Sequence, residues 1–130
     1  MSAENVLKFI KEKEAEFVDL RFTDPRGKLQ HLTMDATIVD ADMLNEGVFF
    51  DGSSIAGWKA INESDMILKP DTARMFMDPF TSHNTAVLFC DILDAIKKDP
   101  YERDPRGVAK KAEEYLKASG IGDKAFFGPE

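Results

Sequence analysis

The chain has 130 residues, of which 43% are hydrophobic and 32% are charged, so it carries enough apolar material for one ordinary core and has the composition of a soluble protein. Its formal net charge of −7 argues against sequence-independent nucleic-acid binding, which requires a cationic surface. No apolar run approaches the roughly 18 residues that a membrane span needs, and the N-terminus lacks a signal-peptide core, so we expect a cytoplasmic protein with neither nucleic-acid nor membrane partners.

The first third of the chain predicts a helix followed by a β-hairpin. Ser2 can cap a helix over residues 3–14, in which apolar residues recur at helical spacing. Over residues 18–23 apolar and polar residues alternate, which predicts a half-buried strand. Residues 24–27 are Asp-Pro-Arg-Gly, the preference of a type I turn, and residues 29–34 are expected to form the return strand.

The middle of the chain predicts a short helix and three more strands. Asp40 can cap a helix that ends near Glu46, with Gly47 as its left-handed C-terminal residue. The expected strands are residues 66–69, 73–77 and 85–93. The last of these is the most apolar run in the chain and the best candidate for a central strand. Together these elements predict an α+β fold with a mostly antiparallel sheet.

After residue 94 the character of the chain changes. Residues 94–105, DAIKKDPYERDP, are polar and contain two prolines, which favours a linker or boundary. Asp104 followed by Pro105 predicts a helix start, and Gly120 predicts its end. Residues 124–130, KAFFGPE, begin as a strand and then stop, which suggests that the sequence is a truncated part of a longer chain.

Residues 49–58, FFDGSSIAGW, place one acid, two hydroxyls and two glycines between large apolar side chains. In one interpretation this is a connecting loop, pinned to its own core by Phe49, Phe50 and Trp58. In the other, the loop presents Asp51 and Ser54 to a ligand or to a neighbouring subunit. Local chemistry alone leaves both open.

The remaining candidates for chemistry are scattered. No Lys or Arg lies between Lys28 and Lys59, while the acids there are Asp35, Asp40, Asp42, Glu46 and Asp51. A solvated face explains such a bias, although a cationic substrate or divalent metals would also be attracted to it. Glu130 follows Gly-Pro, which fixes the backbone and would suit a carboxylate held for a hard cation. His31 and His83 lack metal-ligand spacing and are expected to be structural or solvent-facing, and Cys90 is expected to be a buried thiol.

Five stretches carry a combined pattern: VDLRFTDPRGKLQHLT, FFDGSSIAGWKAINESDMIL, CDIL, YERDPRGVAKKAEEYL and FFGPE. Together they resemble the N-terminal region of bacterial type I glutamine synthetase, in order and spacing, over essentially the whole chain. The resemblance implies a β-grasp-like N-terminal domain over residues 1–103, including its leading helix. The first helix and strand of a truncated catalytic domain would follow over residues 104–130.

The resemblance also implies an activity. Members of the family ligate ammonia to glutamate with ATP, through γ-glutamyl phosphate, to give glutamine in nitrogen assimilation. They use two divalent metals, Mg²⁺ or Mn²⁺, and assemble as homododecamers of two hexamer rings, with each active site shared between adjacent subunits. Because the ATP-binding residues and almost all metal ligands would lie beyond residue 130, we expect the 130 residues alone to be inactive.

By the same resemblance, Asp51 corresponds to the carboxylate that binds ammonium and helps to deprotonate it, with Ser54 beside it. Glu130 corresponds to the first acid of the family's GPExE motif, a metal ligand. Two other hypotheses remain. The chain could be a stand-alone β-grasp interaction module, since fold alone does not settle function, or a regulatory protein that associates with glutamine synthetase rings without catalysing the reaction.

Overall fold

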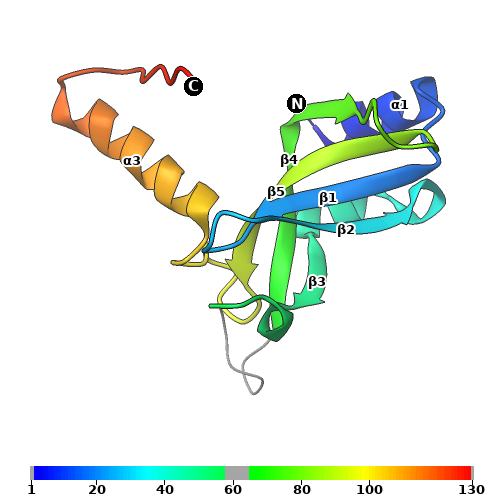
Figure 1. Ribbon diagram of the computed structural model, residues 1–130, viewed down its shortest axis with the longest axis horizontal. Coiled ribbons are helices and arrows are strands. Elements are labelled where there is room, and N and C mark those ends of the chain that lie inside the picture. The colour runs from blue at the N-terminus through cyan, green and yellow to red at the C-terminus, as the bar shows by residue number, and fades with distance from the viewer. Residues whose placement is uncertain (1, 58–64, 130) are drawn as a thin grey trace.

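The computed structural model describes residues 2–57 and 65–129 (Figure 1). Its strands belong to one five-stranded sheet in the order β2-β1-β5-β4-β3. The elements are α1 Ala3–Glu12, β1 Phe17–Thr23, β2 Leu29–Asp35, the 3-10 turn η1 Ala36–Ile38, α2 Ala41–Glu46, β3 Val48–Asp51, the 3-10 turn η2 Gly52–Ser54, β4 Asp65–Met77, β5 Thr85–Asp94 and α3 Pro105–Ser119.

The sheet is mixed but mostly antiparallel, as expected. β1 and β5 lie side by side and parallel, while β1–β2, β3–β4 and β4–β5 are antiparallel pairs. The most apolar strand, β5, occupies the centre between β1 and β4, and its residues 85–88 are buried on both faces of the sheet. The α+β prediction is confirmed.

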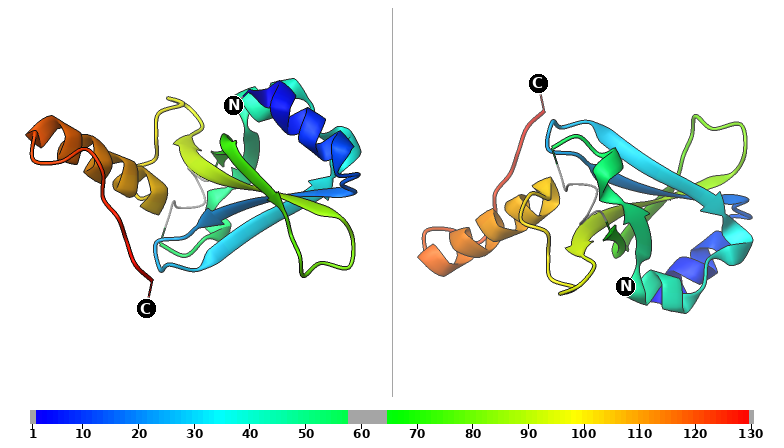
Figure 2. Two further views of the ribbon diagram at one scale, coloured as in Figure 1. Left: turned by 90° about the horizontal axis from the view of Figure 1, so that it is seen from above. Right: turned by 90° about the horizontal axis from the view of Figure 1, so that it is seen from below.

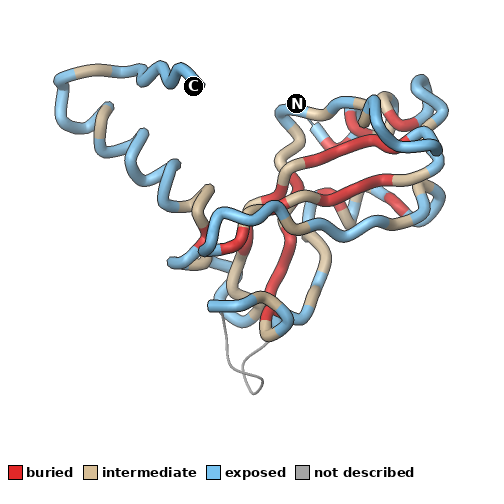
Figure 3. Tube along the Cα trace, in the orientation of Figure 1, coloured by how far each residue is buried: buried red, intermediate tan, exposed pale blue. Residues whose placement is uncertain are grey.

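One face of the sheet carries the core. α1 and α2 lie together on that face (Figure 2), and the buried segments are concentrated in the central strands and the inner side of α1 (Figure 3). Val6 and Ile10 of α1 pack with Val18 and Leu20 of β1 in a single cluster of buried side chains. The alternation that predicted β1 arises because these residues all point toward the helices.

The helix ends follow the sequence signals with small differences. α1 ends at Glu12 rather than at residue 14, and Ser2 occupies its N-cap without a side-chain capping bond. Asp40 caps α2 through the Met43 N–H at 2.7 Å. Gly47 has a positive φ of +90°, but its ψ of −178° is extended rather than left-handed helical, since it turns the chain directly into β3.

Residues 66–69 and 73–77 do not form two strands, as expected from the sequence, but parts of one 13-residue strand, β4. Both parts pair with β5, and the register shifts between Pro70 and Met75. The physical reason is that Pro70 lacks an N–H, so the ladder is interrupted there without reversing the chain.

α3 starts and ends where the sequence predicts: Asp104 caps it and Gly120 ends it in the left-handed conformation. It projects from the sheet and contains no buried residue (Figures 1 and 3). The expected strand near the C-terminus is wrong for the described part, residues 124–129, which form no strand and leave Phe126 and Phe127 each 92% exposed. A strand needs a neighbouring backbone for its hydrogen bonds, and no described segment pairs with this one.

Candidate functional site

Asp51 lies at the end of β3, where the sheet gives way to η2. β3 pairs antiparallel with β4, and Asp51 opposite Asp65 is the last pair of that ladder. The Asp51 side chain is the N-cap of η2: its Oδ1 accepts hydrogen bonds from the Ser53 N–H at 2.9 Å and the Ser53 hydroxyl at 2.6 Å. The carboxylate is thus held in a fixed orientation although the residue is exposed.

Ser54 lies on the same turn and is also exposed, so both predicted residues of this loop are accessible to solvent. The turn is closed by the Ile55 N–H, which donates to the Gly52 carbonyl at 3.1 Å. Two short hydrogen-bonding side chains therefore face outward from a tight, hydrogen-bonded turn.

The loop is also pinned to the core, although not by the set of aromatic residues expected. Phe50 packs on Phe22 with ring centroids 5.3 Å apart, and Ile55 packs against the main cluster. Phe49, by contrast, is 65% exposed, because alternate residues of β3 point to opposite faces of the sheet. Trp58 lies outside the described residues. The two interpretations of the loop are therefore compatible: apolar residues anchor it and polar ones are presented.

The acidic bias before residue 52 has a largely structural explanation. Three of its acids are N-caps: Asp35 caps η1, Asp40 caps α2 and Asp51 caps η2. Each accepts a hydrogen bond from a backbone N–H that its turn leaves without a helical partner. Residues 2–57 and 65–129 contain no group of three or more His, Cys, Asp or Glu side chains placed to hold a metal ion. Glu130, the predicted metal ligand, lies outside the described residues.

The outer face of the sheet carries a polar network that sequence analysis missed. Asp19, 4% exposed, accepts hydrogen bonds from Arg21 Nε at 2.7 Å and from the Thr33 hydroxyl at 2.8 Å, and it pairs with His31 Nδ1 at 2.8 Å. Arg21 also contacts Asp78. Burial alone raises the pKa of Asp19, but the bonds from Arg21, His31 and Thr33 outweigh it and leave the pKa below its usual value. The sequence signal that could have indicated this network is the i, i+2 spacing of Asp19 and Arg21, which places both side chains on the same face of a strand.

A second group of residues, at the start of α3, bonds the helix to the sheet in addition to capping it as predicted. Asp104 is 1% exposed: its Oδ1 accepts from the Arg106 N–H at 3.1 Å and its Oδ2 from the Ile92 N–H of β5 at 3.0 Å. Burial raises the pKa of Asp104 despite these two bonds. Arg106 bridges Asp91 of β5 at 2.9 Å and Asp71 of β4 at 2.7 Å. These contacts fasten the first turn of α3 to the sheet.

The other singled-out residues behave as expected. His83 is largely exposed and pairs with Glu16 at 2.8 Å. Cys90 is fully buried, and burial raises the pKa of its thiol far above the usual range. Neither residue belongs to a site with Asp51.

The sequence profile described as "Glutamine synthetase, beta-Grasp domain" matches residues 14–95, which is more than half of the chain and includes the Asp51 loop. The chain belongs to the glutamine synthetase family. The β-grasp prediction is confirmed by the same match, and the matched region runs from just before β1 to the end of β5.

Curated relatives extend the similarity beyond that region. The glutamine synthetase of Rhizobium meliloti (strain 1021) is 66% identical over 129 residues, which is 99% of this chain and 28% of that protein. The glutamine synthetase of Azorhizobium caulinodans is 60% identical over the same share of each chain. This chain thus spans little more than a quarter of the length of these relatives.

Solved structures support the fold. The cryo-EM structure of Plasmodium falciparum glutamine synthetase superposes with a TM-score of 0.82 over 92% of this chain and 23% of that chain, at 24% sequence identity. At that identity the similarity concerns the fold alone. Within the part of the chain that the structure describes, no helix is long and apolar enough to cross a membrane.

Proposed function

We propose that this chain is part of an ATP-dependent ligase that joins ammonia to glutamate to give glutamine, and that Asp51 receives the ammonium ion and accepts a proton from it, with Ser54 beside it. Membership of the family and 66% identity to a glutamine synthetase support the reaction class. We also propose that the Asp51 loop serves an adjacent subunit in a ring assembly.

One observation carries the assignment of Asp51: an exposed carboxylate held in place by two hydrogen bonds from Ser53. An ammonium ion has to lose a proton before its nitrogen can attack a carbonyl carbon. A carboxylate attracts the cation, accepts its hydrogen bonds and can take the proton. Because Ser53 fixes Oδ1, little ordering of the Asp51 side chain is needed when the cation arrives.

The chemistry proposed for this chain is confined to the ammonium side of the reaction. The described residues do not fit a metal site, and Glu130 lies outside them. We therefore propose that Mg²⁺ or Mn²⁺ and ATP are bound mainly by parts of the enzyme that this chain does not include. The purified 130-residue chain is expected to form no glutamine from glutamate, ammonia and ATP, and measurable ATP-dependent glutamine formation by it would contradict the proposal.

A stand-alone interaction module is less well supported. The β-grasp match ends at residue 95, yet the identity to the Rhizobium meliloti enzyme continues over 129 residues, through α3. A module that only binds has no need of a projecting helix without buried residues. The same similarity favours a part of the enzyme over a separate ring-binding regulator.

The test of Asp51 uses the enzyme at the full length of its relatives and compares Asp51→Asn and Asp51→Ala with a matched control, Asp35→Asn. Asp35 caps η1 with the same geometry: its Oδ1 accepts from the Thr37 N–H at 2.9 Å and the Thr37 hydroxyl at 2.6 Å. The two aspartates therefore share the capping role and differ in the proposed chemistry.

Both Asp51 variants are expected to lose about 10²-fold to 10⁴-fold in turnover, the typical contribution of a positioned general base, and to require more ammonia. Glutamate and ATP should bind nearly as before, and Asp35→Asn should retain its ammonia kinetics. Steady-state kinetics with ammonia varied, together with the oligomer size of each variant, give the answer. An active Asp51→Asn enzyme with an unchanged ammonia requirement would show that Asp51 only caps its turn.

A further inference from the structure

The Asp51 loop, residues 51–57, is bordered by two segments that are distant in sequence. The guanidinium of Arg103 donates through Nη1 to the Gly57 carbonyl at 3.0 Å. Gly57, with φ of +90°, also lies beside the hairpin turn, since a Cβ built on it would be 3.7 Å from Pro25 Cγ. The end of the loop is therefore placed by the β1–β2 turn on one side and by Arg103 on the other.

The backbone on both sides of Arg103 is bonded to the sheet. The next residue, Asp104, is buried and bonded to the Ile92 N–H of β5, and Arg106 bridges two strands. On its N-terminal side, the Tyr101 N–H donates to the Ile92 carbonyl at 2.9 Å, and Tyr101 packs against the core. Arg103 is exposed between Tyr101 and Asp104, which are both bonded to β5. Its backbone is therefore held by the sheet, and its guanidinium can position the end of the loop.

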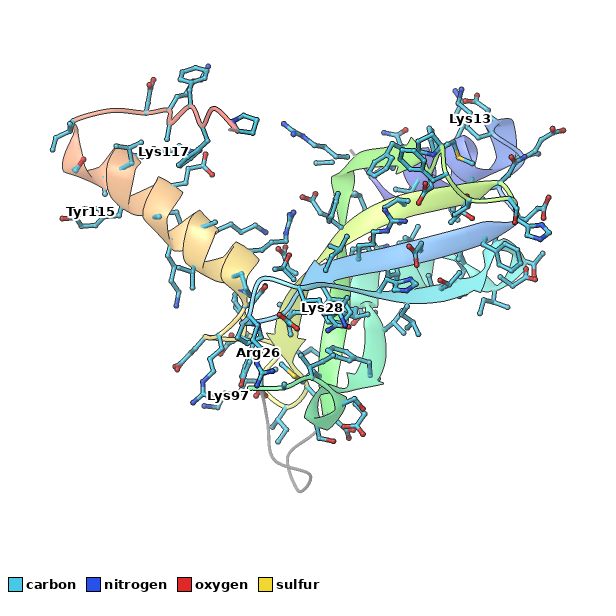
Figure 4. All side chains as sticks on the ribbon, in the orientation of Figure 1. Lys13, Arg26, Lys28, Lys97, Tyr115 and Lys117 are labelled. Carbon is cyan, nitrogen blue, oxygen red and sulfur yellow. The ribbon has the colours of Figure 1, made fainter. Side chains whose placement is uncertain are left out.

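Figures 1 and 2 agree on where the hairpin turn, the Asp51 loop and the start of α3 lie. The hairpin turn and the Asp51 loop lie at the same end of the sheet, and α3 departs from that end (Figures 1 and 2). Arg26 and Lys28, on and just after the turn, lie at this end, opposite Lys13 after α1, while Tyr115 and Lys117 project along α3 (Figure 4). The first turn of α3 and the Asp51 loop thus share one anchoring region.

We propose that Arg103 is a positioning residue that holds the Asp51 loop against the start of α3, so that the Asp51 carboxylate keeps its place. The effect on ammonia kinetics rests on the function proposed above, whereas the effect on the loop does not. Without the guanidinium, Gly57 loses a charge-assisted hydrogen bond, and the loop that begins at Asp51 loses a contact that places its end.

The first arm of the test uses the 130-residue chain and compares Arg103→Ala with Arg74→Ala, an exposed arginine on β4. Amide hydrogen exchange is followed by NMR at Ile55, whose N–H closes the turn, and at Ile92, whose N–H bonds Asp104. Because the Arg103–Gly57 hydrogen bond is exposed and water can replace part of it, its loss predicts about 3-fold to 10-fold faster exchange at Ile55 in Arg103→Ala. Exchange at Ile92 should not change, and Arg74→Ala should match the wild type at both amides.

The second arm uses the full-length enzyme. Arg103→Ala should raise the KM for ammonia by about the same 3-fold to 10-fold, with the KM for glutamate unchanged, and Arg103→Lys should recover part of it by keeping a charged donor. Unchanged exchange at Ile55 overturns the proposal whatever the kinetics. Faster exchange with normal ammonia kinetics, while Asp51→Asn is impaired, overturns the link between loop position and reaction. If Asp51→Asn is also fully active, the proposed function fails and the anchoring of the loop by Arg103 still stands.

Discussion

Replacing Gly47 by alanine tests how the structure delivers Asp51, because Gly47 is the residue that turns α2 into β3. Its φ of +90° and ψ of −178° lie in a region essentially restricted to glycine. A Cβ at this position would lie 2.5 Å from Ile67 Cγ2 and 2.6 Å from the Leu68 carbonyl oxygen, both on β4. The side chain of Ile67 has some freedom to move, but the Leu68 backbone belongs to the sheet and does not.

The two effects add to a large loss of stability. Backbone strain in that region costs about 1–3 kcal/mol, and overpacking against fixed atoms costs about 1–3 kcal/mol more. The lower entropy of the unfolded alanine chain offsets about 0.4–1 kcal/mol. The free energy of unfolding of Gly47→Ala should therefore fall by about 1–5.5 kcal/mol, which for a domain of this size lowers Tm by at least about 3 °C.

Gly27→Ala is the matched control, measured by thermal unfolding of the 130-residue chain. Gly27 also has a positive φ, +83°, but no atom lies within 4 Å of a Cβ built there. It should lose only about 0–1.5 kcal/mol, because strain in the left-handed region is partly offset by unfolded-state entropy. A Tm of Gly47→Ala within about 2 °C of that of Gly27→Ala would contradict the close approach of β4 to Gly47.

Three further predictions concern other parts of the molecule. Asp104→Ala should lower the free energy of unfolding in urea by about 2–4 kcal/mol, because α3 loses its cap and the Ile92 N–H loses its buried acceptor; a loss below about 1 kcal/mol would contradict this. The folded-state pKa of Asp19 is depressed, so its stabilising contribution is present above the unfolded pKa and is lost as pH falls through the folded one. The stability gap between wild type and Asp19→Asn should therefore shrink from pH 7 to pH 3, whereas a constant gap would contradict the depressed pKa. Cys90 should react with a thiol reagent only as fast as the native chain opens, and rapid labelling without unfolding would show that the thiol is accessible.

The spacing of apolar residues and the capping residues were sufficient to predict most of the fold. β1 follows from the alternation over residues 18–23, because Val18, Leu20 and Phe22 belong to the core and the polar residues between them face outward. α3 follows from the Asp104-Pro105 start and the Gly120 stop, which are local signals independent of packing. The central position of β5 follows from its apolar run, since residues 85–88 are buried on both faces and need no alternation.

What was missed depends on contacts between residues distant in sequence. Pro70 resembles a turn signal, but pairing of both flanking segments with β5 makes it a bulge within β4. Asp19, Thr33 and Asp78 lie on separate segments. Arg21 joins Asp19 to Asp78, and Thr33 donates to Asp19, so this network cannot be predicted until the sheet register is known. The segment 124–129 has strand-like residues, but without a neighbouring strand its propensity is not enough.

The candidate site shows the same limit more sharply, because local chemistry gives Asp35 and Asp51 the same description. Each precedes a 3-10 turn, and each accepts a backbone N–H and a hydroxyl from the residue two positions later, at the same distances. The difference lies in what surrounds the turn. η1 connects β2 to α2 and is held beside the start of β1, because the Ala36 N–H donates to the Glu16 carbonyl at 2.9 Å. The loop after Asp51 is bordered instead by the hairpin turn at Pro25 and by Arg103 before α3. Both turns are exposed and held in place, as a proton acceptor requires, so what singles out Asp51 is that its loop meets the segment before α3, which is distant in sequence.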